Sequence, residues 1–176
     1  VFNWRLKNHV IVIGDSPFGR QLIRALTDGH QRLIWVCPEV DDLYAIDTLP
    51  KVTLKMETGD WQRDMKDCRL ATASRVFVVS DNELDNARVT QQLGLHLGEN
   101  TEGAPLHCHV ALGLSGNGVL HDVGAAPALS KGRLQVHLFD PIRIAARALI
   151  KEHVPVLLDG DLKVPHVLVV GFGALG

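Results

Sequence analysis

Hydrophobic residues along this chain form short, β-branched runs that alternate with segments in which apolar residues recur at helical spacing. This alternation is typical of a parallel sheet whose strands are joined by crossover helices. The predicted strands are 9–13, 32–36, 52–57, 75–79, 106–112 and 134–139. We therefore expect an α/β fold with a parallel sheet of six strands, in which 52–57 lies at an edge because its apolar and polar residues alternate.

The same patterns predict where the connecting helices lie. The predicted helices are 17–27, 41–49, 62–68, 80–94 and 141–152. The helix 80–94 opens with a capping box, Ser-Asp-Asn-Glu, and is expected to end at Gly94. The connections near 98–105 and 113–133 are expected to be long loops.

The turn between the first strand and the first helix has the pattern of a dinucleotide-binding βαβ unit. In G-x-G-x-x-G, the first glycine makes a tight turn, the second admits a pyrophosphate and the third packs helix on strand. Gly14 and Gly19 hold the first and third places, whereas Ser16 holds the second and suits a helix N-cap followed by Pro17. Asp15 adds a negative charge beside the phosphate position. We therefore expect a Rossmann-like, doubly wound sheet in strand order 3-2-1-4-5-6, with nucleotide binding here weak or absent.

A nucleotide bound at this turn would contact the phosphate and ribose positions of the fold. Its pyrophosphate would lie on the backbone amides from Ser16 to Gly19, which include Phe18, at the N-terminus of the helix. Glu39 lies 20 residues after Gly19 and is the candidate for the ribose hydroxyls, although an ordinary surface glutamate fits this position equally well.

Two further segments follow predicted strands and are candidates for the base. Gly59, Asp60 and Trp61 would flank the adenine, and Ser80 and Asp81 would line the crevice where the strand order reverses. The alternative is that Asp60 is only a helix N-cap and that Trp61 is only a core aromatic residue.

The end of the chain repeats its beginning. The segment 166–171, HVLVVG, nearly matches 9–14, HVIVIG. A full G-x-G-x-x-G pattern follows at Gly171, Gly173 and Gly176. We expect 1–153 to form one Rossmann domain and 154–176 to be a linker and the first strand of a second, truncated Rossmann unit. The parent protein would then carry two such units, of which the second is the stronger nucleotide site.

Composition excludes several functional classes. The net charge is −2, and no basic run suggests a nucleic-acid partner. The three cysteines are widely spaced without a C-x-x-C motif, which favours a reducing compartment over a disulfide framework. No apolar stretch reaches the roughly 18 residues that would indicate a membrane span.

Residues able to carry catalysis do not form a recognisable set, since neither a P-loop nor a nucleophile elbow occurs. His107 and His109 share one face of a predicted strand, with Cys108 opposite, but no third metal ligand is spaced nearby. Three functions remain open: a ligand-sensing regulatory module, the cofactor-binding part of an NAD(P)-dependent oxidoreductase, and a scaffold that serves only in assembly. The second glycine pattern favours the first of these.

Four segments together resemble one family. They are VIVIGDSPFG with its helix, the Gly59-Asp60 turn, RVFVVSDNELDN and LFDPIRIAARAL, which span about 9–150 in the family's order. In these segments the chain resembles the RCK or TrkA-N domains, the regulatory domains of potassium channels and transporters. Ser16 and the displaced Glu39 depart from the family pattern.

The resemblance implies a function. It implies a cytoplasmic domain at the inner face of the plasma membrane that senses NAD(H) or another adenine nucleotide and is not an enzyme. It implies a potassium channel or transporter as the membrane partner. It also places the helix 142–150 at the contact of a homodimer.

Overall fold

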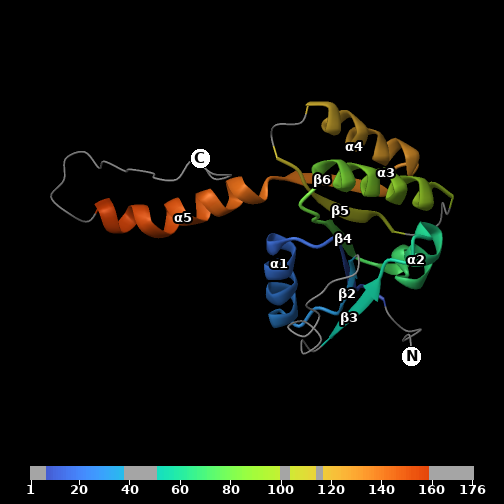
Figure 1. Cartoon of the computed structure of the whole chain (residues 1–176), viewed down its shortest axis with the longest axis horizontal. Coiled ribbons are helices and arrows are strands. Elements are labelled where there is room, and N and C mark those ends of the chain that lie inside the picture. Colours follow the sequence, from blue (N-terminus) through green and yellow to red (C-terminus); the bar gives the residue numbers. More distant parts are fainter. Residues whose placement is uncertain (1–6, 38–50, 100–103, 114–116, 159–176) are drawn as a thin grey trace.

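The structure is a computed structural model, and strands and helices alternate along most of the chain (Figure 1). It describes residues 7–37, 51–99, 104–113 and 117–158. In chain order the elements are β1 (Val10–Ile13), α1 (Pro17–Asp28), β2 (Leu33–Cys37), β3 (Val52–Met56), α2 (Trp61–Asp67), the 3-10 helix η2 (Leu70–Thr72), β4 (Arg75–Val78), α3 (Glu83–Glu99), β5 (Leu106–Ala111), α4 (Asn117–Leu129), β6 (Leu134–Phe139) and α5 (Pro141–Leu158). The predicted helix 41–49 lies outside the described residues.

One six-stranded sheet has the order β3-β2-β1-β4-β5-β6, and every neighbouring pair is parallel. At its centre, Val10 of β1 lies opposite Leu33 of β2 and Arg75 of β4. The direction of winding reverses between β1 and β4, so the segments that follow these strands diverge and leave a crevice. The predicted Rossmann-like fold and strand order are therefore confirmed, with β3 as an edge strand.

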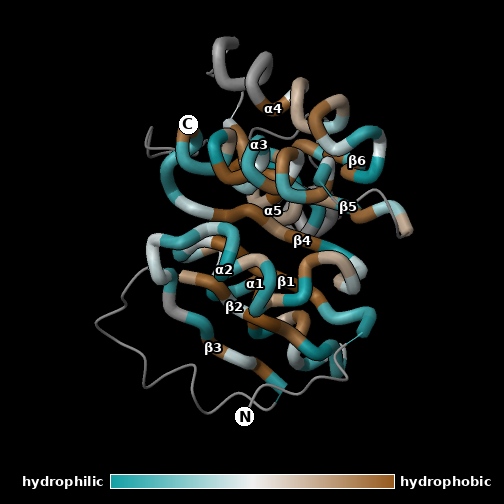
Figure 2. Tube along the Cα trace, turned by 90° about the vertical axis from the view of Figure 1, so that its right-hand side faces the viewer, coloured by the Kyte–Doolittle hydropathy of each residue, from teal (hydrophilic) through white to brown (hydrophobic). Residues whose placement is uncertain are grey.

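The sheet separates two hydrophobic cores. One core packs α2, α3 and α4 against the strands through side chains such as Met65, Leu93 and Val123. The other packs α1 against the opposite face, where Ile23 and Trp35 are completely buried. In Figure 2, hydrophobic strands run through the interior, whereas hydrophilic residues are frequent on the surrounding helices. The sheet is therefore covered on both faces around β1, as apolar parallel strands require.

Two glycines bring α3 and α4 into close contact. A Cβ atom at Gly94 would lie 2.6 Å from the backbone oxygen of Ala126, and one at Gly98 would overlap the backbone oxygen of Leu129. The prediction that the helix ends at Gly94 was wrong, since α3 continues to Glu99. These glycines allow two helices to pack rather than ending one of them.

Two other local predictions were also wrong. The expected loop 113–133 contains α4, in which glycine and Pro127 weaken the helical signal but packing against α3 and β6 stabilises the helix. The expected capping box at 80–83 does not form, because the Glu83 carboxylate accepts a hydrogen bond from the Gly113 N–H instead. Asn82 provides the side-chain oxygen near the start of α3 by accepting the Leu84 N–H.

Helix α5 projects away from the body of the domain (Figure 1). It continues to Leu158, so the expected end at 152 was wrong by six residues.

On the face of the sheet that carries α1, the rings of Phe77, His109 and His137 stack with centroids 4.8 and 5.0 Å apart. His107 also stacks on His137, while Cys108 is buried on the opposite face as predicted. Among the described residues, no group of three or more side chains is placed to hold a metal ion.

Candidate functional site

The glycine turn after β1 is closed by its own neighbours. Gly14 has a φ of +99°, and a Cβ atom there would lie only 2.7 Å from the backbone nitrogen of Ser80. Both conditions require glycine, because L-residues rarely adopt this φ and the contacting atom belongs to the backbone. The Gly14 N–H donates to the Val36 carbonyl, and its carbonyl accepts from Trp35 Nε1 at 2.8 Å. The turn is therefore held from β2 and β4 at once.

Several donors at the N-terminus of α1 are already used or missing. Ser16 is the N-cap, and its Oγ accepts the Gly19 N–H at 2.9 Å. Pro17 has no N–H to donate. Gly19 fits against Val79, since an added Cβ would lie 2.9 Å from a Val79 methyl carbon. This helix end therefore offers a phosphate fewer backbone donors than a glycine-rich loop does.

Asp15 and Arg20 form a two-pronged ion pair beside this turn. Arg20 donates from Nε at 2.8 Å and from a terminal nitrogen at 2.7 Å to the two carboxylate oxygens of Asp15. The pair is partly exposed, so solvent weakens its contribution to stability. Arg20 is thus directed to a carboxylate of its own chain.

A cavity of about 480 Å³ opens next to the turn, at the carboxyl ends of β1, β3 and β4. This is where the strand order reverses and where ligands bind in open α/β sheets, and the volume suits a small molecule. The cavity is lined by Ile13, Gly14, Asp15, Glu57, Gly59, Trp61, Asp64, Val78, Ser80, Asp85, Asn86, Arg88, Val89 and Gln92. Helices α2 and α3 therefore supply much of its wall.

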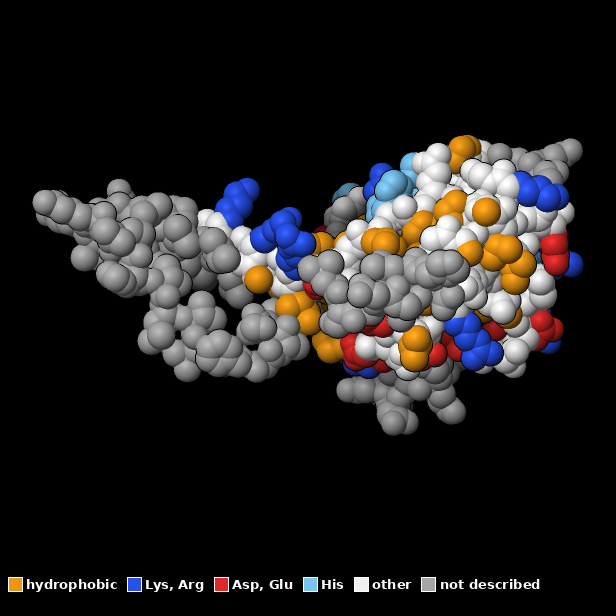
Figure 3. Space-filling view, turned by 90° about the horizontal axis from the view of Figure 1, so that it is seen from above, with side chains coloured by type: hydrophobic (Ala, Val, Ile, Leu, Met, Phe, Trp, Pro, Cys, Tyr) orange, Lys and Arg blue, Asp and Glu red, His pale blue; other side chains and the backbone are white. Residues whose placement is uncertain are grey.

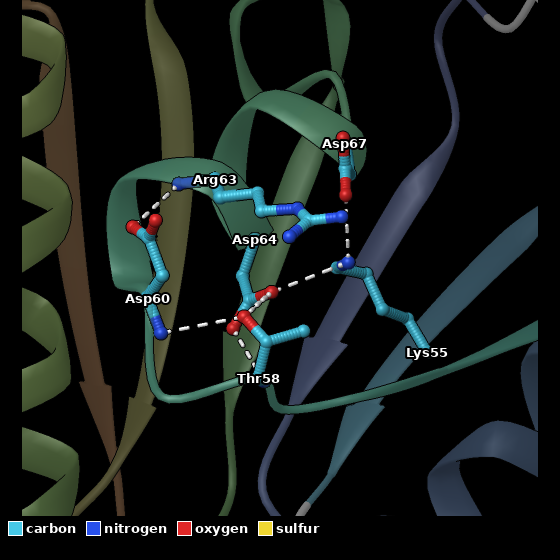
Figure 4. A network of polar contacts seen from close by, with 6 residues as sticks. All are labelled: Lys55, Thr58, Asp60, Arg63, Asp64 and Asp67. Carbon is cyan, nitrogen blue, oxygen red and sulfur yellow. Dashed lines mark hydrogen bonds and ion pairs between the residues drawn. The ribbon is translucent and has the colours of Figure 1, made fainter.

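A buried polar network shapes the side of the cavity that follows β3 (Figure 4). Asp64 is buried and accepts from the Thr58 N–H at 3.0 Å and from the Thr58 hydroxyl at 2.8 Å. Lys55 Nζ lies 3.2 Å from Asp64 and 2.9 Å from Asp67. These contacts join β3 to α2 and hold the turn between them, where Asp60 caps α2 by accepting the Arg63 N–H.

The network shifts the pKa values of both buried charged groups. Burial alone would raise the pKa of Asp64, but hydrogen bonds from Thr58 and the charge of Lys55 outweigh it and lower the pKa. Burial alone would lower the pKa of Lys55, yet hydrogen bonds to Asp67 and Asp64 leave that pKa raised. Both groups therefore carry their charges at neutral pH.

Glu57 lies in a different environment at the end of β3. The residue is exposed and belongs to the lining of the cavity. Desolvation there, with the negative charges of Asp64 and Asp85, raises the pKa of Glu57. The raised pKa therefore reflects mainly the burial of this carboxyl group, with a smaller contribution from the two neighbouring carboxylates.

On the other wall, Asn86 of α3 holds the segment after β4. Its carboxamide accepts the Ser80 N–H and donates to the carbonyls of Ser80 and Ala111, each at 2.8 Å. Asn86 is buried, so these bonds satisfy most of its hydrogen-bonding capacity. Ser80 is thereby held against Gly14 at the reversal point.

The structure brings some of the predicted nucleotide contacts together and separates others. The predicted residues that line the cavity are Gly14, Asp15, Gly59, Trp61 and Ser80. Ser16, Pro17, Phe18 and Gly19 form the start of α1 beside the cavity, and Asp81 is exposed after β4. Trp61 combines the two alternatives considered for it, since it packs against the core and lines the cavity. Glu39, Gly171, Gly173 and Gly176 lie outside the described residues.

Several lining residues were missed from the sequence. Glu57 precedes the Gly59 turn by two positions, so its place at the end of a predicted strand was a usable signal. Asp85, Arg88 and Gln92 belong to the helix after β4, and only their helical spacing could have grouped them.

No helix among the described residues is both long and apolar enough to cross a membrane.

Comparison with known proteins gives a likeness of fold. No protein-family model matches the chain, and no curated protein matches it. The RCK domain of GsuK superposes with a TM-score of 0.54 at 19% identity, covering 84% of this chain and 29% of that one. The TrkA-N domain of the Escherichia coli inner membrane protein ybaL has a TM-score of 0.54 at 12% identity, covering 84% of this chain and 98% of that one.

Nucleotide-bound structures are among the similar ones. GsuK bound to ADP has a TM-score of 0.56 at 16% identity, covering 82% of this chain and 34% of that one. The GsuK channel bound to NAD has a TM-score of 0.53 at 18% identity, covering 84% of this chain and 24% of that one. This chain therefore spans about a third or less of these GsuK chains, and it shares the fold of RCK and TrkA-N domains.

Proposed function

We propose that this chain is a cytoplasmic regulatory domain that senses an adenine nucleotide and controls a potassium channel or transporter. The observation that carries the proposal is the cavity at the reversal point, formed by β1, β3, β4 and α3 on a fold shared with RCK and TrkA-N domains. The similar GsuK structures with ADP and NAD support an adenine nucleotide as the ligand. The structures named are regulatory domains and a channel, so we favour regulation over catalysis.

Blocking the cavity tests ligand binding. Gln92 lines the cavity from α3, so Gln92→Trp should fill part of it and weaken binding of ADP and NAD at least tenfold by calorimetry. Leu95→Trp is the matched control, because Leu95 is exposed on the same helix and should leave affinity unchanged. Equal affinity in both variants would contradict the proposal, provided that circular dichroism shows both to be folded.

We further propose that α5 forms the contact of a homodimer. Ile142 and Ile144 are 40% and 47% exposed, and Figure 3 shows hydrophobic and basic side chains together on the projecting helix. Exposed apolar side chains of this kind gain stability when a partner covers them. Ile144→Asp should shift sedimentation toward monomer, whereas Leu84→Asp, an equally polar change at an exposed residue of α3, should not. A wild-type protein that stays monomeric at high concentration would argue against the dimer.

We also propose that a second Rossmann unit of the parent protein begins within 154–176. Gly173 provides the glycine that Ser16 replaces in the first unit, so the second unit is the stronger nucleotide site. In the full-length protein, Gly173→Asp should abolish the nucleotide dependence of potassium flux, while Gly14→Asp should mainly reduce stability. Flux that stays nucleotide-dependent in Gly173→Asp would reverse this ranking of the two units.

A further inference from the structure

The cavity is unusually acidic for a site that would receive phosphates. Among the described residues, its lining includes the carboxylates of Asp15, Glu57, Asp64 and Asp85 and one cation, Arg88. Asp15 and Asp64 are paired with cations of their own chain, whereas Glu57 and Asp85 form no ion pair in the part of the chain that the structure describes. A ligand with several negative charges would be repelled here.

The neighbouring glycine turn does not compensate for this repulsion. The Gly19 N–H is bonded to Ser16, and Pro17 has no N–H. The second place of the glycine pattern, where a pyrophosphate approaches the backbone, carries the side chain of Ser16. The two devices by which Rossmann folds usually hold a diphosphate, a free helix N-terminus and an open glycine, are therefore both reduced.

Other features of the cavity suit an uncharged base and sugar. Ile13, Val78 and Val89 provide apolar surface, and the carboxamide of Gln92 offers both a donor and an acceptor. The side chain of Trp61 also lines the cavity, while its Nε1 is buried and has no hydrogen-bond partner among the described residues. A purine has ring nitrogens that accept a hydrogen bond from a carboxamide such as that of Gln92.

The acidic groups suit the sugar in particular. Ribose hydroxyls donate hydrogen bonds to carboxylates, as at the acidic position that binds ribose in dinucleotide folds. Glu57 at the end of β3 and Asp85 near the start of α3 lie on two walls of the same cavity. The carboxylates that would repel a diphosphate can therefore accept hydrogen bonds from the hydroxyl groups of a nucleoside.

We propose that the cavity prefers an adenine nucleoside without phosphates over ADP or NAD. This inference rests on the proposed function for the choice of adenine, and the preference itself comes from the lining. It is the reverse of the order expected for a phosphate-binding Rossmann turn. The preference is electrostatic, so it depends on salt and on the carboxylates of Glu57 and Asp85.

Calorimetry with adenosine, AMP, ADP and NAD tests the preference on the whole chain. Adenosine should bind at least tenfold more tightly than ADP in 50 mM NaCl. Raising NaCl to 500 mM should tighten ADP binding by screening repulsion and leave adenosine within twofold. Weaker ADP binding in high salt would overturn the inference, because it would indicate attraction of the phosphates by cations.

Charge variants at the two carboxylates complete the experiment. Glu57→Gln combined with Asp85→Asn should tighten ADP at least threefold and leave adenosine unchanged or weaker. Asp28→Asn is the control for net charge, since Asp28 lies at the exposed end of α1 and should change neither affinity. Tighter binding of ADP or NAD than adenosine to the wild type would overturn the inference but retain the proposed function. Failure of all four compounds to bind would overturn both.

Discussion

The glycine turn and the cavity meet at Gly14, yet they satisfy their polar groups in opposite ways. In the turn, backbone and side-chain groups bond to one another, as in the Ser16–Gly19 cap and the contacts of Gly14 with β2. In the cavity, the lining residues Glu57 and Asp85 form no ion pair within the described part of the chain. The polar groups of the turn are thus bonded within the protein, whereas the polar groups of the cavity lining would be bonded by a ligand.

This difference teaches that the parts of a Rossmann crevice can change independently. The strand, turn and helix retain the geometry of the fold, because Gly14 and Gly19 are required by backbone and side-chain contacts within the domain. The donors for phosphate are reduced without loss of that geometry. The fold alone therefore does not identify the ligand.

The largest expected effect is on the free energy of unfolding, and it distinguishes Gly14 of the turn from Gly59 of the cavity lining. Gly14→Ala should lower the free energy of unfolding by about 3 kcal/mol, because it adds an unfavourable φ and a clash with the Ser80 backbone. Gly59→Ala is the matched variant, since Gly59 also has a positive φ but nothing lies within 4 Å of an added Cβ. It should cost only about 1 kcal/mol in urea unfolding. Equal losses would show that crowding at Gly14 contributes nothing.

The next effect concerns the buried network beside the cavity. Asp64→Asn should lower the free energy of unfolding by about 2 kcal/mol at pH 7, because Lys55 then keeps only Asp67 as a charged partner. Asp67→Asn should cost less than about 1 kcal/mol, since Asp67 is 40% exposed and Lys55 retains Asp64.

The pH dependence of this stabilisation has a defined sign. The folded pKa of Asp64 is depressed, so its contribution is present above the unfolded pKa of about 3.8 and is lost as pH falls through the folded pKa. The difference between wild type and Asp64→Asn should therefore shrink in acid. A difference that stays constant down to pH 2 would contradict this origin.

A smaller effect is expected at the closed turn. Ser16→Ala should lower the free energy of unfolding by about 1 kcal/mol by removing the N-cap, and Ser16→Gly by only a few tenths. Ser16→Gly also frees the Gly19 N–H, so ADP binding should tighten while adenosine binding stays unchanged. Thermal melts and calorimetry on both variants measure these effects. Unchanged ADP affinity in Ser16→Gly would show that the cap does not limit phosphate binding.

The smallest effect is a stabilisation at the cavity. The folded pKa of Glu57 is raised, so this group favours folding below its unfolded pKa of about 4.5 and loses that contribution as pH rises through the folded pKa. Glu57→Gln should therefore be slightly more stable than the wild type at pH 7, and the gain should disappear near pH 4. A variant that is less stable at pH 7 would indicate that the carboxylate stabilises the cavity instead.

The sequence alone was sufficient to predict the fold, because its signals are local. Apolar runs predicted the six strands, and the Gly14–Gly19 turn with Ser16 and Pro17 predicted the start of the first helix. Strand order then followed from the Rossmann pattern that the glycine turn indicates, together with right-handed crossovers. Local pattern failed where Gly94 and Gly98 serve contacts between α3 and α4, since a glycine in a sequence does not show whether it ends a helix or admits a neighbour.

The character of the site was decided by tertiary structure. Glu57, Asp64 and Asp85 are spread over a strand and two helices, and only the folding of α2 and α3 over one sheet face brings them to a single cavity. The same packing pairs Asp64 with Lys55, whereas Glu57 has no ion pair within the described ranges of the chain. Charge and burial at a site depend on neighbours that are distant in sequence, whereas strands and turns depend on adjacent residues. The local sequence pattern therefore determined the strands, turns and helices, and the tertiary packing determined which polar groups a ligand in the cavity would contact.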